Sequence, residues 1–123
     1  MSKKIDVWTR GAVLNNCAGV YCNDNTVVRV MNDGSAIVEL FGNKIFYRDS
    51  IGRVYFTLAE HNTQTTRARL NVLLSYYCNM EIYCRSKTAS LRGATFDKKP
   101  LNDSIWYRAR WGEAEISKVQ VFD

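Results

Sequence analysis

An Asp-Gly turn between two runs of strand-forming residues constrains the fold of this chain more than any other feature. The first run, residues 26–31, is rich in β-branched side chains, and the second run covers residues 35–41. Asp33 and Gly34 lie between them, and Asp-Gly favours a type I′ turn because both central positions of that turn need a positive φ angle. The pattern therefore predicts an antiparallel hairpin.

Further strands predict that this hairpin is part of a longer meander. A Gly-Asn pair marks the next turn, and two more strand-like runs follow within residues 44–58. In the second strand of the hairpin, Ala36, Val38 and Leu40 form the cleanly apolar set of alternating positions. We therefore expect these three side chains to face the core.

One segment has the periodicity of an amphipathic helix. Leu70, Leu73, Leu74 and Tyr77 recur at the spacing that places apolar side chains on one helix face. The Asn and Thr residues at positions 62–66 are candidate N-caps. The sequence therefore predicts one main helix that ends at the Cys-Asn pair following Tyr77.

The chain becomes strand-like again after this helix. Alternating patterns predict strands at residues 80–84, 104–111 and 116–122, and residues 86–103 have the composition of a loop or an irregular hairpin. No strand–helix alternation of the kind that builds a parallel sheet is present. We therefore predict an α+β fold, with an antiparallel β-meander sheet packed on one main α-helix and further C-terminal strands, in a single domain covering residues 1–123.

The composition is that of an ordinary globular protein, with 46% hydrophobic and 24% charged residues. No apolar run approaches the roughly 18 residues of a membrane span, and the lysines near the N-terminus precede no signal-peptide segment. We therefore expect a cytoplasmic protein with no membrane partner. The formal net charge is +5, and residues 66–111 hold 9 basic and 3 acidic residues, which favours an anionic partner.

The sequence carries no common catalytic motif. It has no P-loop, GxGxxG, HExxH or nucleophile-elbow pattern. His61 is the only histidine, and no other part of the chain completes a triad around it. Glu113 and Glu115 lie two residues apart, which indicates a solvated strand edge rather than an acid–base pair. We predict a protein that is not an enzyme, with no catalytic residues and no cofactor.

The four cysteines, at positions 17, 22, 78 and 84, form two loosely spaced pairs. Their spacing is wider than that of most zinc knuckles, and thiols are the default state without an export signal. We expect Cys84 to be buried in the apolar stripe of its strand. The prediction is four free thiols and no metal site, although Cys17 and Cys22 could pair if the residues between them form a tight hairpin.

Basic and aromatic residues gather in the second half of the chain. The candidate partner-binding residues are Tyr83, Arg85, Trp106, Arg108, Arg110 and Trp111. Such residues can anchor a protein interface, because Trp, Tyr and Arg dominate interface energetics. They can also stack the bases and contact the phosphates of single-stranded nucleic acid. The alternative without a partner is that arginine stems cover Trp106 on a solvated sheet face.

The start of the predicted helix offers a third candidate site. His61, Thr65, Thr66 and Arg67 could bind a small anion such as a nucleotide, because the first N–H groups of a helix attract negative charge. A capping role alone explains the same residues.

Residues 42–74 combine a short strand pair, a Phe-Thr strand end and the sequence Thr-Thr-x-x-Arg-Leu-Asn that begins at Thr65. This combination resembles small uncharacterised proteins of tailed bacteriophages. The resemblance implies a phage origin and action in the host cytoplasm. Small phage proteins without catalytic motifs often inhibit host factors, so it also implies a host or defence-system protein as partner, with CRISPR–Cas as the specific expectation. No functional residue is carried over, since threonine caps and exposed Arg69 and Asn71 side chains would explain the motif locally.

Overall fold

The computed structural model describes residues 4–93, 99–117 and 121. Within this part, the elements follow in the order α1 (Lys4–Leu14), β1 (Gly19–Asn23), β2 (Thr26–Val30), β3 (Ala36–Leu40), β4 (Asn43–Arg48), β5 (Val54–Phe56), α2 (Gln64–Cys78), β6 (Met80–Arg85), β7 (Thr88–Gly93), β8 (Lys99–Pro100), β9 (Tyr107–Arg110) and β10 (Glu113–Ile116). Neither helix of the described part has the length and apolar character that a membrane crossing requires.

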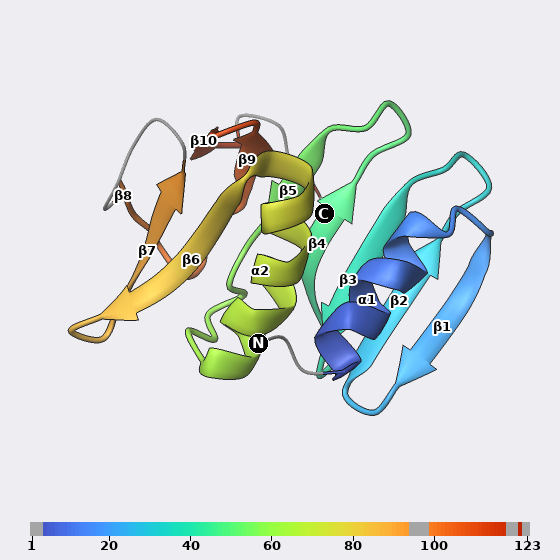
Figure 1. The fold of residues 1–123 in the computed structure, drawn as a ribbon, viewed down its shortest axis with the longest axis horizontal. Helices are drawn as coiled ribbons and strands as arrows, with labels where there is room; N and C mark the ends of the chain where they lie inside the picture. The colour runs from blue at the N-terminus through green and yellow to red at the C-terminus, as the bar shows by residue number, and fades with distance from the viewer. Residues whose placement is uncertain (1–3, 94–98, 118–120, 122–123) are drawn as a thin grey trace.

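The strands form two antiparallel sheets. Seven strands pair in the spatial order β1-β2-β3-β4-β5-β9-β10, and β6, β7 and β8 make a smaller sheet. Figure 1 shows α1 and α2 on one face of the large sheet, with the small sheet beside α2. Strands β1 to β5 are successive hairpins, so the predicted meander, the α+β class and the additional C-terminal strands are confirmed.

The β2–β3 hairpin is confirmed, but its turn is not of the predicted type. Gly34 has a φ of 89°, whereas Asp33 does not adopt a positive φ. The Gly34 N–H donates to the Met31 carbonyl at 3.1 Å, and the Asp33 carboxylate accepts from Ser35 N and Oγ at 2.9 and 2.6 Å. These hydrogen bonds from Ser35 lower the pKa of Asp33. They also stabilise a loop in which Gly34 is the residue with a positive φ angle.

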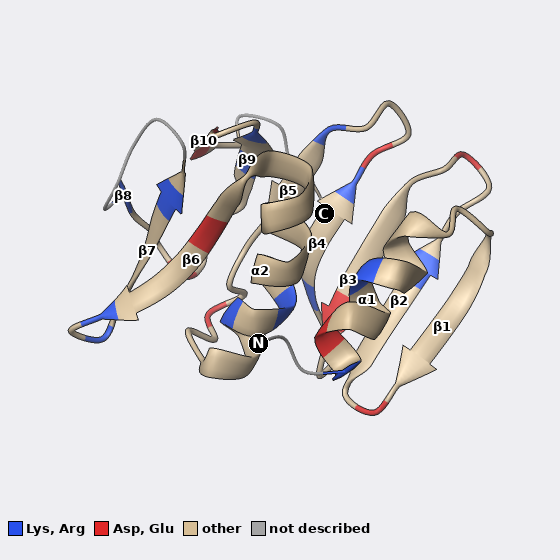
Figure 2. Ribbon diagram, in the orientation of Figure 1, with Lys and Arg blue, Asp and Glu red and all other residues tan. Residues whose placement is uncertain are grey.

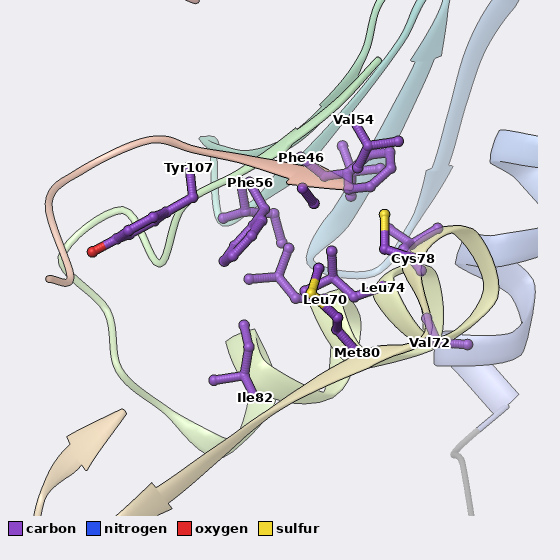
Figure 3. Close-up of a cluster of buried hydrophobic side chains, with 14 of the residues drawn as sticks. Phe46, Val54, Phe56, Leu70, Val72, Leu74, Cys78, Met80, Ile82 and Tyr107 are labelled. Atoms are coloured by element: carbon purple, nitrogen blue, oxygen red, sulfur yellow. The ribbon is translucent and has the colours of Figure 1, made fainter. Parts of the chain in front are cut away.

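The core lies between the large sheet, α2 and β6. The alternation predicted for β3 is confirmed, because its three predicted core positions are all buried. Figure 3 shows Phe56 and Tyr107 from the sheet facing Leu70 of α2 and Ile82 of β6. The Phe56 and Tyr107 rings stack with centroids 5.5 Å apart. Residues from both halves of the chain therefore share one apolar cluster.

Helix α2 begins and ends as its sequence predicts. The Thr63 side chain accepts a hydrogen bond from the Thr66 N–H at 3.2 Å, which is an N-cap. Asn79 ends the helix in the left-handed conformation, with a φ of 55°. The predicted stripe of Leu70, Leu73 and Leu74 is buried.

Helix α1 is absent from the sequence prediction. Its buried face carries Asp6 and Thr9 beside Ala12 and Val13, so its apolar stripe is half polar. Asp6 is stabilised by Arg69 of α2 through a buried ion pair. A helix whose buried positions depend on a partner 63 residues away gives a weak periodic signal in the sequence.

Two further side chains of α2 were expected on the surface and lie inside. Arg69 is only 4% exposed, and besides its ion pair with Asp6 it donates to the Thr26 hydroxyl at 3.0 Å. Asn71 is half-buried and bonds both backbone groups of Ile82, at 2.8 and 2.6 Å. The expectation that both are exposed is therefore wrong, because their partners lie on other elements.

A second buried arginine ties α1 to the sheet. Arg48, at the end of β4, is 8% exposed. Its Nη1 donates to the Val13 carbonyl at 3.2 Å and to the Tyr77 hydroxyl at 2.8 Å. Its Nη2 donates to Asn16 Oδ1 at 3.0 Å and to the Gly34 carbonyl at 2.7 Å. One guanidinium thus joins both helices and the β2–β3 turn.

The C-terminal strands differ from the prediction in two places. Residues 88–93 form the regular strand β7, in which Ala89 and Leu91 are buried. The polar residues around these two positions have the composition of a loop, which explains the prediction of a loop or an irregular hairpin. The last described strand is β10, which starts three residues before the predicted strand at residues 116–122. Residues 118–120 and 122 of that predicted strand lie outside the described residues.

Candidate partner-binding site

Strand β9 sets the orientation of two of the six predicted partner-binding residues, Arg108 and Arg110. Tyr107 and Ala109 are buried against the core, so Arg108 and Arg110 point to the other face of the large sheet. The alternation expected along residues 104–111 is therefore confirmed for residues 107–110, whereas Ile105 and Trp106 precede the strand and are both half-buried.

Trp111 lies in the tight turn between β9 and β10 and is 69% exposed. The next residue, Gly112, has a φ of 76° and donates its N–H to the Cys78 carbonyl at 2.6 Å. This bond fixes the turn against the C-terminal end of α2, where Tyr76 is 52% exposed. Figure 1 shows β9 and β10 beside the junction of α2 and β6. We call Arg110 and Trp111 the Trp111 corner.

The charge at this corner is balanced. Arg110 forms an ion pair with Glu115 at 3.3 Å between groups that are both about half exposed. Glu113, on the same face of β10 as Glu115, is exposed as predicted. Figure 2 shows basic and acidic residues side by side on β9 and β10. The corner therefore presents aromatic surface with charges of both signs rather than a positive patch.

Arg108 occupies the position between β5 and β10 on the outer face of the large sheet. Its register partners are Tyr55 and Glu115. The side chain is half-buried, and its buried Nε has no hydrogen-bond partner among the described residues. A buried donor without an acceptor destabilises a folded protein by about 1–3 kcal/mol.

Tyr83 and Arg85 lie apart from the other candidates, in the small sheet. The Arg92 guanidinium lies 4.6 Å from the centroid of the half-buried Tyr83 ring and also pairs with Glu81 at 2.8 Å. Arg85 is exposed at the end of β6. The six predicted residues are thus divided between two sheets, since strand periodicity does not reveal which strands pair.

The C-terminal end of α2 carries a hollow. It has a volume of about 300 Å³ and opens where α2 passes into β6. Its lining residues are Ser75, Asn79, Met80, Glu81, Arg92 and Gly93. The sequence did not lead us to predict a role for Tyr76 or for this hollow. The available signal for Tyr76 was a large aromatic residue outside the apolar stripe of α2.

The four candidate anion-binding residues do not converge. His61 and Thr66 border a pocket of about 250 Å³ whose other walls include Leu40, Ile45 and Leu58. Thr65 borders a separate cavity with Asp6, Asp24 and Arg69, where Asp6 already pairs with the Arg69 guanidinium. Arg67 instead donates to Asn62 Oδ1 at 2.5 Å. The geometry favours a capping and packing role for this segment.

The cysteines occupy different environments from those expected. Cys78 is buried, and burial raises the pKa of its thiol to about 11. Cys84 is exposed, so the expectation of a buried Cys84 is wrong; its strand leaves the core after Ile82. Cys17 and Cys22 are exposed and are not bridged. The described residues contain no group of three His, Cys, Asp or Glu side chains suited to a metal ion. Free thiols and the absence of bound metal remain predictions.

Comparison with known proteins gives one family and no individual relative. Neither the curated proteins nor the solved structures include a match to this chain. The family model described as Kyanoviridae Gp96 protein matches residues 2–111, which confirms the resemblance to small phage proteins. The matched range includes both helices and the strands up to β9, together with Trp111. The chain is therefore a phage accessory protein and belongs to the Kyanoviridae Gp96 protein family.

Proposed function

We propose that this protein is a non-enzymatic inhibitor that binds a host protein through the Trp111 corner. The observation that carries the proposal is the 69% exposure of Trp111, a large apolar side chain placed in a structured turn. Trp, Tyr and Arg are the residue types that most often dominate binding energy at protein interfaces. The corner presents a Trp and an Arg, and Tyr76 is exposed in the last turn of α2.

The local chemistry supports a protein partner over a nucleic acid. Backbone phosphates would have to compete with Glu115 for Arg110, and Glu113 would repel them. In the small sheet, Glu81 engages Arg92 in the same way. A protein surface can meet aromatic groups and charges of both signs.

The proposed partner is part of a bacterial defence system, with CRISPR–Cas as the specific candidate. Two features support this choice: membership of a phage family, and a sequence without a catalytic motif. The proposed site of action is the host cytoplasm. A single-stranded nucleic acid is the second candidate, and its binding would weaken steeply with rising salt because phosphate contacts release counterions.

The test is affinity purification from host cells with matched variants of the bait. Truncating a central aromatic anchor costs about 2 kcal/mol or more, which is roughly a 30-fold loss of affinity. Trp111→Ala should therefore lose the partner that the wild-type protein retains in stoichiometric amount. Ile51→Ala is the control, because Ile51 is 73% exposed in the β4–β5 turn, outside the corner.

Two results would contradict the proposal. One is the absence of any stoichiometric protein from the wild-type bait while circular dichroism confirms that the bait is folded. The other is equal recovery of the same protein with the wild-type bait and with Trp111→Ala. Recovery of nucleic acid in a salt-sensitive manner, without protein, would favour the second candidate.

A further inference from the structure

We infer that β1 pairs edge to edge with β1 of a second copy of this chain, so that the two large sheets join into one. β1 is the outermost strand at one end of the seven-stranded sheet. It is five residues long and contains no charged residue and no proline. Val20, beside the central residue Tyr21, is 57% exposed, and Cys22 is also exposed.

Proteins normally block such an edge with a charge, a proline, a bulge or a covering side chain. The β1–β2 register runs without a bulge from Gly19 to Asn23. Among the described residues, no side chain or strand other than β2 hydrogen-bonds β1. The outward N–H and C=O groups of this strand are therefore available to another strand.

The other strand edges are blocked by residues of this chain. At β10, the Lys99 ammonium donates to the Ala114 carbonyl. At β6, the Asn71 side-chain amide bonds both backbone groups of Ile82 and takes the place of a neighbouring strand. β8 has only two residues, and Pro100 has no N–H to donate. Within the part of the chain that the structure describes, β1 is therefore the edge left open for pairing.

A second copy is the occupant that fits this edge. Two-fold symmetry about Tyr21 makes β1 pair antiparallel with itself, with Val20 opposite Cys22 and Gly19 opposite Asn23 of the other copy. No charged side chain enters the pairing, and the two copies of Asp24 fall at opposite ends of the joined strands.

The distribution of charge also permits this association. Most of the excess positive charge lies within residues 66–111, with 9 basic against 3 acidic residues. Figure 2 shows β1 at one end of the molecule and the small sheet, with its basic hairpin, at the other end. Joining two copies through β1 therefore keeps their most basic regions far apart, which limits electrostatic repulsion.

The dimer should depend on concentration. A single five-residue strand pair buries less than the roughly 1,200 Å² of a stable interface. Size-exclusion chromatography with light scattering is the first test, run over a wide concentration range in excess reductant to exclude disulfides through Cys17 or Cys22. The wild-type protein should shift from monomer to dimer as concentration rises.

The matched variants are Val20→Lys and Ile51→Lys, which each place one lysine at an exposed apolar position. Val20→Lys should remain monomeric throughout, because it introduces charge at the paired edge, whereas Ile51→Lys should dimerise like the wild type. A wild-type protein that stays monomeric at every concentration overturns the inference. Equal dimerisation of the wild type and Val20→Lys overturns it as well.

Amide exchange of the wild-type protein tests the same edge without a substitution. The backbone N–H groups of β1 that face away from β2 should exchange more slowly at high concentration than at low concentration. Exchange that does not depend on concentration at these positions contradicts the pairing.

Discussion

Replacing Arg48 by alanine should destabilise the protein far more than any exposed substitution. The Tyr77 hydroxyl and the Val13 carbonyl are the least accessible acceptors of its guanidinium, and the Gly34 carbonyl is partly accessible. Asn16 is exposed, so water can replace that hydrogen bond. An orphaned buried acceptor costs about 1–3 kcal/mol. Two full losses and one partial loss predict a decrease of about 3–5 kcal/mol in the free energy of unfolding.

Urea unfolding followed by circular dichroism measures this change, with a lower midpoint at unchanged slope as the expected result. Arg53→Ala is the matched control from the same β4–β5 hairpin. Its side chain is 45% exposed and pairs with Asp49 at 2.5 Å, so its loss should cost no more than about 1 kcal/mol. If Arg48→Ala costs as little as Arg53→Ala, the account of Arg48 as the link between the helices and the sheet is wrong.

The remaining stability and reactivity predictions concern other buried or half-buried groups. Asp6→Ala leaves the Arg69 charge buried without its partner and should lower the free energy of unfolding by about 3–5 kcal/mol. Replacing both Asp6 and Arg69 with apolar residues should restore much of this loss. Equal unfolding midpoints for the single and double variants would contradict this prediction. Ellman's reagent should modify three thiols quickly and Cys78 slowly. Burial raises the pKa of the Cys78 thiol from 9.0 to about 11, so the protonated thiol contributes at most about 2–3 kcal/mol to the free energy of unfolding. This contribution is complete below pH 9 and declines as the pH rises to about 11. If the free energy of unfolding of Cys78→Ala declines equally at alkaline pH, another group causes the decline. Asn71→Ala removes both hydrogen bonds to Ile82 and should cost about 1–3 kcal/mol in the same urea assay, and a change below about 0.5 kcal/mol would show that these bonds contribute little.

The parts of the fold that depend on neighbouring residues could be predicted from the sequence. The β2–β3 hairpin follows from an Asp-Gly pair between strand-forming runs, and the limits of α2 follow from Thr63 and Asn79 at its caps. Each signal acts over a few residues, so the chain displays it without tertiary information. The predicted type of the hairpin turn was wrong, because the Asp33 carboxylate caps the loop.

Features that depend on distant residues could not be predicted. Helix α1 has polar residues on its buried face, and the pairing of Asp6 with Arg69 across 63 residues makes that face stable. Strand β7 resembles a loop in composition, and its pairing with β6 makes it a strand. Tertiary contacts override local preference in both cases.

The candidate site was recovered only in part for the same reason. The alternation of Arg108 and Arg110 with buried neighbours follows from strand periodicity alone. The contact of the β9–β10 turn with the end of α2 depends on a hydrogen bond between Gly112 and Cys78. No local pattern encodes a bond across 34 residues.

The most direct test of the proposed function is site-specific photocrosslinking in host cells. A photoreactive phenylalanine analogue replaces Trp111 in one variant and Ile51 in a second, since both positions are exposed. After illumination, we expect the Trp111 variant to form one predominant adduct with a host protein and the Ile51 variant to form none. The same adducts from both positions, or no protein adduct at Trp111 in folded protein, would contradict binding through the Trp111 corner.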